Sequence, residues 1–171
     1  INGDNTTDVL TINSKLNQII GSNNIAFGIN SLNSNTTGSL NVALGLSTLL
    51  NNTAGFRNTA IGSQSLRENT DGNQNTAVGD QTLITNTEGD ANAAVGYSAL
   101  HFNSTGINNT AVGTQSGYRI STGTDNVFIG YKSGISGSQL ATAVNSIAIG
   151  ANTFTTADNQ IVIGDANITE T

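Results

Sequence analysis

The sequence predicts an all-β solenoid, a parallel β-roll of about nine coils with a 17-residue repeat. Three observations predict it: one glycine recurs at equal intervals, a short apolar triplet precedes each of these glycines, and no segment has the apolar spacing of a helix. In such a repeat protein each unit buries its apolar side chains against the next unit.

The repeating glycine marks the end of each expected strand. The first seven of these glycines are equally spaced, the eighth follows after a longer interval and the ninth after a shorter one. They are Gly28, Gly45, Gly62, Gly79, Gly96, Gly113, Gly130, Gly150 and Gly164. A glycine after β-favouring residues is typical of a turn, so each unit is expected to contain a short strand followed by a turn.

The triplet before each glycine has a small residue, usually alanine, between residues that are mostly larger. Side chains alternate between the two faces of a strand, so the alanine and its neighbours point in opposite directions. A solvated face would accept Thr, Lys or Glu, so the alanines indicate close approach of another layer, most economically a second copy of the chain. We therefore predict a subunit interface at Ala26, Ala43, Ala60, Ala77, Ala94, Ala111 and Ala148. The alternative is that the alanines face the inside of the roll and the larger residues face the partner.

A leucine lies four residues after the glycine in the first five units, Leu32, Leu49, Leu66, Leu83 and Leu100. We expect a second short strand to carry this leucine back to the interior, so that each unit is a flat coil of two strands and two turns. In two later units Gly117 and Gly134 take the place of the leucine, and Phe128 takes the place of an alanine.

Asparagines recur at two positions of the repeat. The first set lies four residues before the glycine and comprises Asn24, Asn41, Asn58, Asn75, Asn92, Asn109 and Asn126. The second lies ten residues before it and comprises Asn35, Asn52, Asn69, Asn86 and Asn103. Asparagines in register form hydrogen-bonded ladders, which we predict above all for the first set. The alternative is that asparagine merely suits turns.

The C-terminal repeats resemble a known family. The stretch NSIAIG at 145–150, followed by QIVIG at 160–164, resembles the short head repeat of trimeric autotransporter adhesins of the Yersinia-adhesin type. Longer units such as GNQNTAVGDQTL resemble repeats in tail fibres of bacteriophages and contractile injection systems. The resemblance covers about residues 21–168 and implies a left-handed parallel β-roll, assembled as a homotrimer on a virion, an injection particle or a bacterial surface. The extra residues of the longer units are expected in the return loop.

The two ends differ from the repeats. Residues 1–20 lack the glycine pattern and are expected to form a β cap or the end of a preceding shaft. Residues 169–171 are expected to lead into the following fibre element. The chain starts at Ile1 without a signal-like stretch, so we expect it to be a piece of a longer protein.

Composition excludes several functions. The net charge of −6 argues against nucleic acid as a partner, and no apolar run is long enough for membrane insertion. With no cysteine and one histidine, we expect no metal site and no cofactor. Asp71 and Glu88 fall one rung apart, which would suit a polysaccharide-cleaving pair, or a calcium site together with Asp90. We favour a solvated acidic edge and expect no enzymatic activity.

Binding is better supported than catalysis. The variable positions after the glycine and in the return loop carry Tyr97, His101, Phe102, Tyr118, Arg119, Tyr131 and Lys132. These side chains are candidates for docking a cell-surface glycan or protein receptor, although the rings could instead cover the edge of the roll or fill the space left by Gly117 and Gly134.

The expected function is a non-enzymatic structural and adhesive segment of a trimeric surface fibre. Two alternatives remain open. A polysaccharide-degrading tailspike would use the stacked carboxylates. An ice-binding solenoid would use the row of Thr59, Thr76 and Thr110, which is broken by Ile25, Val42 and Ala93.

Overall fold

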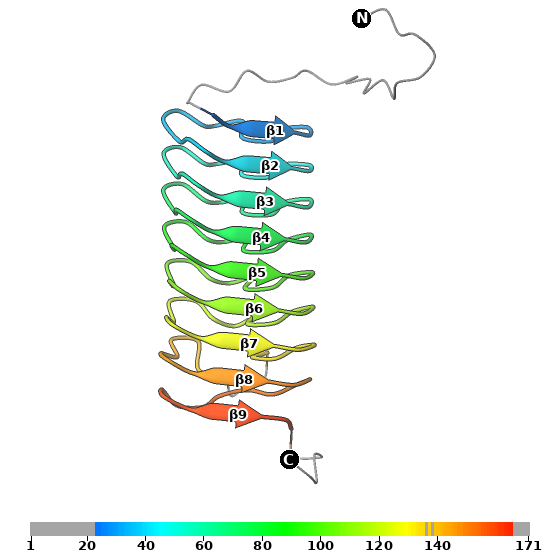
Figure 1. Ribbon diagram of the computed structural model, residues 1–171, viewed down its shortest axis with the longest axis vertical. Coiled ribbons are helices and arrows are strands. Elements are labelled where there is room, and N and C mark those ends of the chain that lie inside the picture. Colours follow the sequence, from blue (N-terminus) through cyan, green and yellow to red (C-terminus); the bar gives the residue numbers. More distant parts are fainter. Residues whose placement is uncertain (1–22, 136, 138, 166–171) are drawn as a thin grey trace, which may run out of the picture.

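The computed structural model describes residues 23–135, 137 and 139–165. These residues form one nine-stranded parallel sheet, in which each strand pairs only with the strands directly before and after it in the chain. The strands are β1 (Ile25–Phe27), β2 (Val42–Leu44), β3 (Thr59–Ile61), β4 (Thr76–Val78), β5 (Ala93–Val95), β6 (Thr110–Val112), β7 (Val127–Ile129), β8 (Ile147–Ile149) and β9 (Ile161–Ile163). Figure 1 shows them stacked as the rungs of a rod. The predicted β-solenoid with a 17-residue repeat is therefore confirmed.

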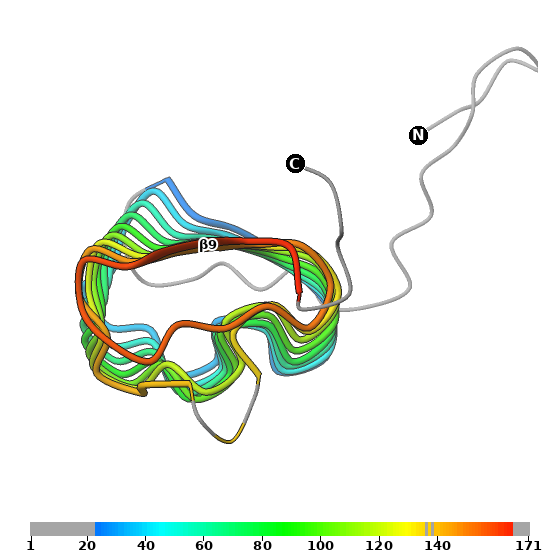
Figure 2. The same ribbon diagram turned by 90° about the horizontal axis from the view of Figure 1, so that it is seen from below.

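The strand register follows the repeat. Ala60 of β3 lies opposite Ala77 of β4, and Phe128 of β7 lies opposite Ala148 of β8, although the second pair is separated by a longer stretch of sequence. The extra residues of the longer unit are accommodated in the return loop, as predicted, where the chain between β7 and β8 leaves the outline shared by the other coils (Figure 2). The expected cap at 1–20 and the element at 169–171 lie outside the described residues.

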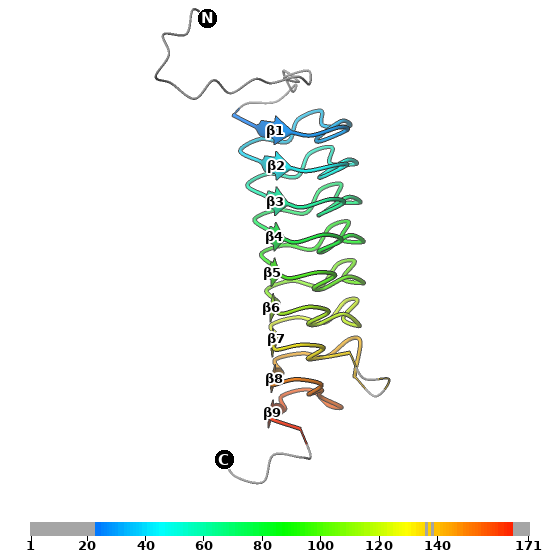
Figure 3. The same cartoon turned by 90° about the vertical axis from the view of Figure 1, so that its right-hand side faces the viewer.

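The return path of each coil differs from the prediction. The second strand expected to carry the leucine is absent from the described part of the chain, and the strands form a single sheet along one side of the rod (Figure 3). The return path is instead a series of turns with left-handed residues, such as Arg57, Gln64 and Leu66, with φ of 56°, 58° and 50°. These turns still bond from coil to coil, because the Leu66 N–H donates to the Thr82 carbonyl at 3.0 Å. Stacking therefore supports a backbone conformation that leucine rarely adopts.

The repeating glycine is required by both backbone and space. Gly79 has φ of 136°, and a Cβ there would lie 2.5 Å from the carbonyl oxygen of Gly96 in the next coil. The N–H of Gly79 donates to the Ile61 carbonyl at 2.8 Å, so each glycine also continues the ladder of its strand. A side chain at this position would separate the coils.

The interior consists of the alanine column facing the leucine column, and Ala60, Ala77, Leu66 and Leu83 have no exposed area. The prediction that the alanines form a subunit interface is therefore wrong, because their own chain encloses them. Ala26 in the first described coil is half-buried, whereas Ala43, Ala60, Ala77, Ala94, Ala111 and Ala148 are fully buried. The alternative that they face the inside of the roll is confirmed. The coil is too narrow to take larger strand residues inward, so these point outward.

Two residues interrupt the alanine column, Phe128 in β7 and Val162 in β9, and two glycines compensate for the larger of them, Phe128. A Cβ at Gly117 would lie 2.7 Å from Leu100 Cδ2 and 3.0 Å from Phe128 Cδ2, and a Cβ at Gly134 would lie 2.7 Å from Phe128 Cδ1. The buried ring thus takes the space that leucines take in other coils. The exposed aromatic residues do not fill this gap.

Both asparagine ladders are confirmed. In the first set, Asn58 Oδ1 accepts from the backbone N–H of Asn75 at 3.0 Å, and Asn58 Nδ2 donates to the Gly72 carbonyl at 2.8 Å. In the second set the side chains bond directly, with Asn69 Nδ2 donating to Asn52 Oδ1 at 2.8 Å. The second ladder ends at Asn103, whose buried Oδ1 has no partner because the next coil has Ile120 at the equivalent position.

Hydroxyl groups form a further column, which was not predicted. The Thr53 hydroxyl donates to the Thr70 carbonyl at 3.2 Å, and the Thr70 hydroxyl donates to the Thr87 carbonyl at 3.1 Å. The signal was present in the sequence, since Thr or Ser recurs once in every unit from Thr36 to Ser121.

Within the described residues, no helix is long and apolar enough to cross a bilayer.

Candidate functional site

The outer side of the sheet is an exposed apolar surface. The two residues that flank the central residue of each strand point away from the interior and form two columns along the rod. We call this surface the apolar sheet face. Its first column is Ile25, Val42, Thr59, Thr76, Ala93, Thr110, Val127, Ile147 and Ile161, and its second is Phe27, Leu44, Ile61, Val78, Val95, Val112, Ile129, Ile149 and Ile163.

The apolar sheet face is large and carries no charged residue. Val95 and Val112, at the middle of the rod, are 41% and 42% exposed. With strands spaced by about 4.8 Å and about 10 Å long, nine strands give a flat footprint of roughly 400 Å². Contiguous apolar patches of about this size on soluble proteins are often functional.

The threonines considered for ice binding lie in the first column of this face. Thr59, Thr76 and Thr110 occupy consecutive rungs except at β5, where Ala93 interrupts them. The second column is aliphatic apart from Phe27. The face is therefore predominantly a hydrocarbon surface, and the hydroxyl row is short.

A second surface feature is a cluster of aromatic side chains on the return side of β5 and β6. The rings of His101 and Tyr118 are stacked at 4.9 Å between centroids, and Phe102 lies edge-to-face with them at 4.7 Å and 5.0 Å. Arg119 follows Tyr118, and its Nε donates to the Ile135 carbonyl at 3.0 Å. We call His101, Phe102, Tyr118 and Arg119 the aromatic corner.

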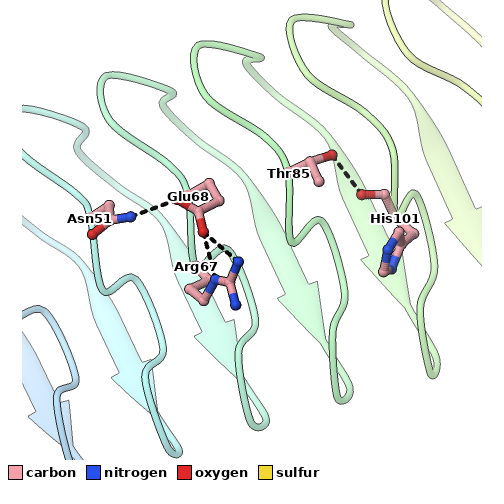
Figure 4. Close-up of polar contacts among 5 residues, drawn as sticks. All are labelled: Asn51, Arg67, Glu68, Thr85 and His101. Atoms are coloured by element: carbon pink, nitrogen blue, oxygen red, sulfur yellow. Dashed lines mark hydrogen bonds and ion pairs between the residues drawn. The ribbon is translucent and has the colours of Figure 1, made fainter.

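The same corner is polar in earlier coils. Figure 4 shows Asn51 Nδ2 donating to Glu68 at 2.6 Å, and Arg67 forming an ion pair with Glu68 at 2.6 Å. At the equivalent place of the next coil, the Thr85 hydroxyl donates to the His101 carbonyl at 2.7 Å. These residues occupy the places of Phe102 and its neighbours one to three coils earlier. The character of the corner therefore changes along the rod while its backbone repeats.

The other predicted binding residues do not join this cluster. Tyr97 and Tyr131 are exposed, and Lys132 Nζ lies 5.1 Å from the centroid of the Tyr131 ring. Among the described residues, ring contacts join only His101, Phe102 and Tyr118. The structure thus brings three of the seven predicted residues into contact, places Arg119 next to Tyr118 in the chain, and leaves Tyr97, Tyr131 and Lys132 outside the cluster.

The electrostatics of the aromatic corner are simple. Burial lowers the pKa of His101 from its usual value of 6.5, an effect larger than the opposing hydrogen bond with the Gln81 backbone. The ring nitrogen Nδ1 of His101 is buried and has no hydrogen-bond partner. His101 is therefore neutral at neutral pH, and the positive charge of the corner belongs to Arg119.

The carboxylates considered for catalysis or calcium binding lie on the return side of the coils. Asp71 and Glu88 are exposed, and Asp90 accepts a hydrogen bond from the backbone N–H of Asn73 at 2.6 Å. Over the described ranges, no three His, Cys, Asp or Glu side chains lie close enough together to hold a metal ion.

Comparison with known protein families, characterised proteins and solved structures found no match to this chain.

Proposed function

We propose that the chain is a non-enzymatic structural and adhesive segment of a homotrimeric fibre on a virion, an injection particle or a bacterial surface. The observation that carries this proposal is the apolar sheet face. Leaving such a face in water is unfavourable by about 25 cal/mol for each Å² of apolar area, so burying it against a partner stabilises an assembly.

A second copy of the chain is the partner that fits best. Two copies present columns with the same spacing between rungs, so their side chains can interdigitate along the full rod. The face contains no charged side chain, and the chain's net charge of −6 therefore does not place like charges opposite one another in the contact. The trimeric state, rather than a dimer, is suggested by the resemblance of the repeats to trimeric fibres.

The interior suits a mechanical role. The backbone ladders, both asparagine ladders and the hydroxyl column all run from coil to coil, along the length of the rod. Bending the rod would stretch several of these bonds at once. A stiff segment of this kind would hold surface side chains at fixed spacing, and three chains would present each of them in triplicate, which raises avidity.

The experiment is a mass measurement by sedimentation equilibrium at micromolar concentration. A particle near three times the chain mass of 17.4 kDa is expected. Replacing Val95 and Val112 with lysine would place charges at the centre of the face and is expected to give monomers, with the circular dichroism spectrum retained because both side chains already point outward. Thr105→Lys, on an exposed return turn, is the matched control and should leave the mass unchanged. A monomeric wild type, or a double variant with the wild-type mass, would refute the proposal.

A further inference from the structure

We propose that the aromatic corner binds a saccharide that carries a carboxylate. The inference refines the proposed adhesive role. It rests on that role only because a trimeric fibre would present the site three times. It is carried by three features: a partly exposed ring cluster that the fold does not require, an arginine with no acidic partner among the described residues, and a backbone already engaged in hydrogen bonds.

The solenoid does not need aromatic residues at this corner. The places of His101 and Phe102 are taken by Ile84 and Thr85 one coil earlier. The backbone bonds are of the same kind in both coils: the Thr85 N–H donates to the His101 carbonyl and the Phe102 N–H to the Tyr118 carbonyl, each at 3.4 Å. Phe102 nevertheless leaves 48% of its surface exposed. In a chain that is only 5% aromatic, three contacting rings on the surface indicate a binding role.

Arg119 supplies the second half of the site. Its Nε donates to the Ile135 carbonyl of the next coil, which restricts the movement of the side chain. The ion pair found in the described structure is that of Arg67 with Glu68, so the guanidinium of Arg119 has no carboxylate opposite it there. Guanidinium groups bind carboxylates through paired N–H bonds. On a chain with net charge −6, a guanidinium without a carboxylate partner among the described residues attracts an anionic group locally.

The spacing of the two halves fits a sugar. Phe102 and Arg119 occupy the same place in consecutive coils, about 4.8 Å apart along the rod. A single sugar unit can lay the C–H groups of its ring against Phe102 while its carboxylate reaches Arg119. Tyr118, which is half-buried, carries a hydroxyl that can donate to or accept from a sugar hydroxyl.

A peptide fits the corner less well. Extended peptides gain affinity by pairing with a free sheet edge. Here the neighbouring backbone groups are already paired between coils, since the Leu100 N–H donates to the Ser116 carbonyl at 2.9 Å. Recognition is therefore left to side chains, through ring contact and one ion pair, which is the pattern that suits an acidic saccharide.

The test is an array of immobilised oligosaccharides that end in a uronic or sialic acid, each with a neutral counterpart of equal length. The wild-type chain is expected to bind the acidic members in preference to the neutral ones. Arg119→Gln should weaken that binding at least tenfold and remove the preference. Phe102→Thr, which copies Thr85 and so preserves the fold, should weaken binding to both kinds.

Phe56 and Arg57 provide the matched control. They form another exposed ring and guanidinium pair, with Arg57 Cζ 5.6 Å from the centroid of the Phe56 ring, on a different edge of the coil. Phe56→Thr and Arg57→Gln should leave binding unchanged. The inference would be overturned by an absence of binding to every acidic member, by equal binding to the neutral counterparts, or by equal losses in the control variants.

The mass of each sample, measured in parallel, separates this inference from the proposed function. A trimer that binds no acidic saccharide would overturn the inference alone. A monomer that binds an acidic saccharide through Phe102 and Arg119 would refute the trimeric fibre and leave the site intact.

Discussion

The Phe128 ring fills the space that leucines fill in other coils, where this chain has Gly117 and Gly134. This compensation leads to a quantitative prediction about packing. Phe128→Ala removes a fully buried ring and should lower the free energy of unfolding by about 3–5 kcal/mol. Gly117→Leu and Gly134→Leu each force a side chain against neighbours that a Cβ would already meet at 2.7 Å, which costs about 1–3 kcal/mol apiece. Acting independently, the three changes would cost about 5–11 kcal/mol.

The triple variant is expected to be far more stable than that sum. It restores the alanine and leucine packing of coils such as those of β3 and β4, and Leu100, with φ of 48°, shows that leucine is accommodated at this backbone position. We expect a total loss of about 3 kcal/mol or less, because residues in contact couple strongly. The assay is urea unfolding followed by circular dichroism at a fixed protein concentration. A loss in the triple variant equal to the sum of the single losses would refute the compensation.

Three further predictions concern the ladders, the glycine column and the histidine. Asn75→Ala leaves the Gly89 carbonyl and the Asn92 N–H without their partners at 2.7 Å and 2.9 Å, so urea unfolding should show a loss of at least about 3 kcal/mol, against almost none for Thr105→Ala. Gly79→Ala should cost at least about 2 kcal/mol, since φ is 136° and the next coil is in contact; an unchanged urea midpoint would contradict this. Because burial lowers the pKa of His101, the unfolded chain binds the proton more tightly, so stability should hold above pH 6.5 and fall as the pH drops below it. A pH series of melting curves checks this, and His101→Ile, which copies Ile84, should remove that part of the decline.

The period, the strands and both asparagine ladders could be predicted because each depends on residues that recur in register. The assignment of inside and outside could not be predicted in the same way. Alternation says that Ala77 and Val78 point to opposite faces, but the width of the coil decides which of them is buried. That width admits only a small side chain opposite a leucine, and it becomes known only once the return path is known.

The return path was missed for a different reason. Leu66 has no intrinsic preference for a left-handed backbone, so nothing in a single unit indicates it. The conformation is stabilised by hydrogen bonds to the next coil, and such a collective cause is invisible in a local pattern.

The residues of the aromatic corner could have been separated from the other candidates by comparing their positions within the repeat. Tyr118 follows His101 by one full unit of the repeat, and Arg119 follows Phe102 by the same interval, so the repeat places these four side chains on consecutive rungs. Tyr97 and Tyr131 occupy another place in the unit and are two coils apart from each other. The contacts between the rings, by contrast, depend on side-chain rotamers that the repeat does not specify.

The pairing of each strand with only its immediate neighbours has a consequence for how such a chain can evolve. Duplication or loss of one unit among the regular coils would change the reach of the rod by about 4.8 Å and leave every remaining contact of the same type. The coil of Phe128 is different, because its ring needs a glycine both in its own coil and in the preceding one. Insertions and deletions of units are therefore expected among the other coils, while the coil of Phe128 and the one before it are retained together.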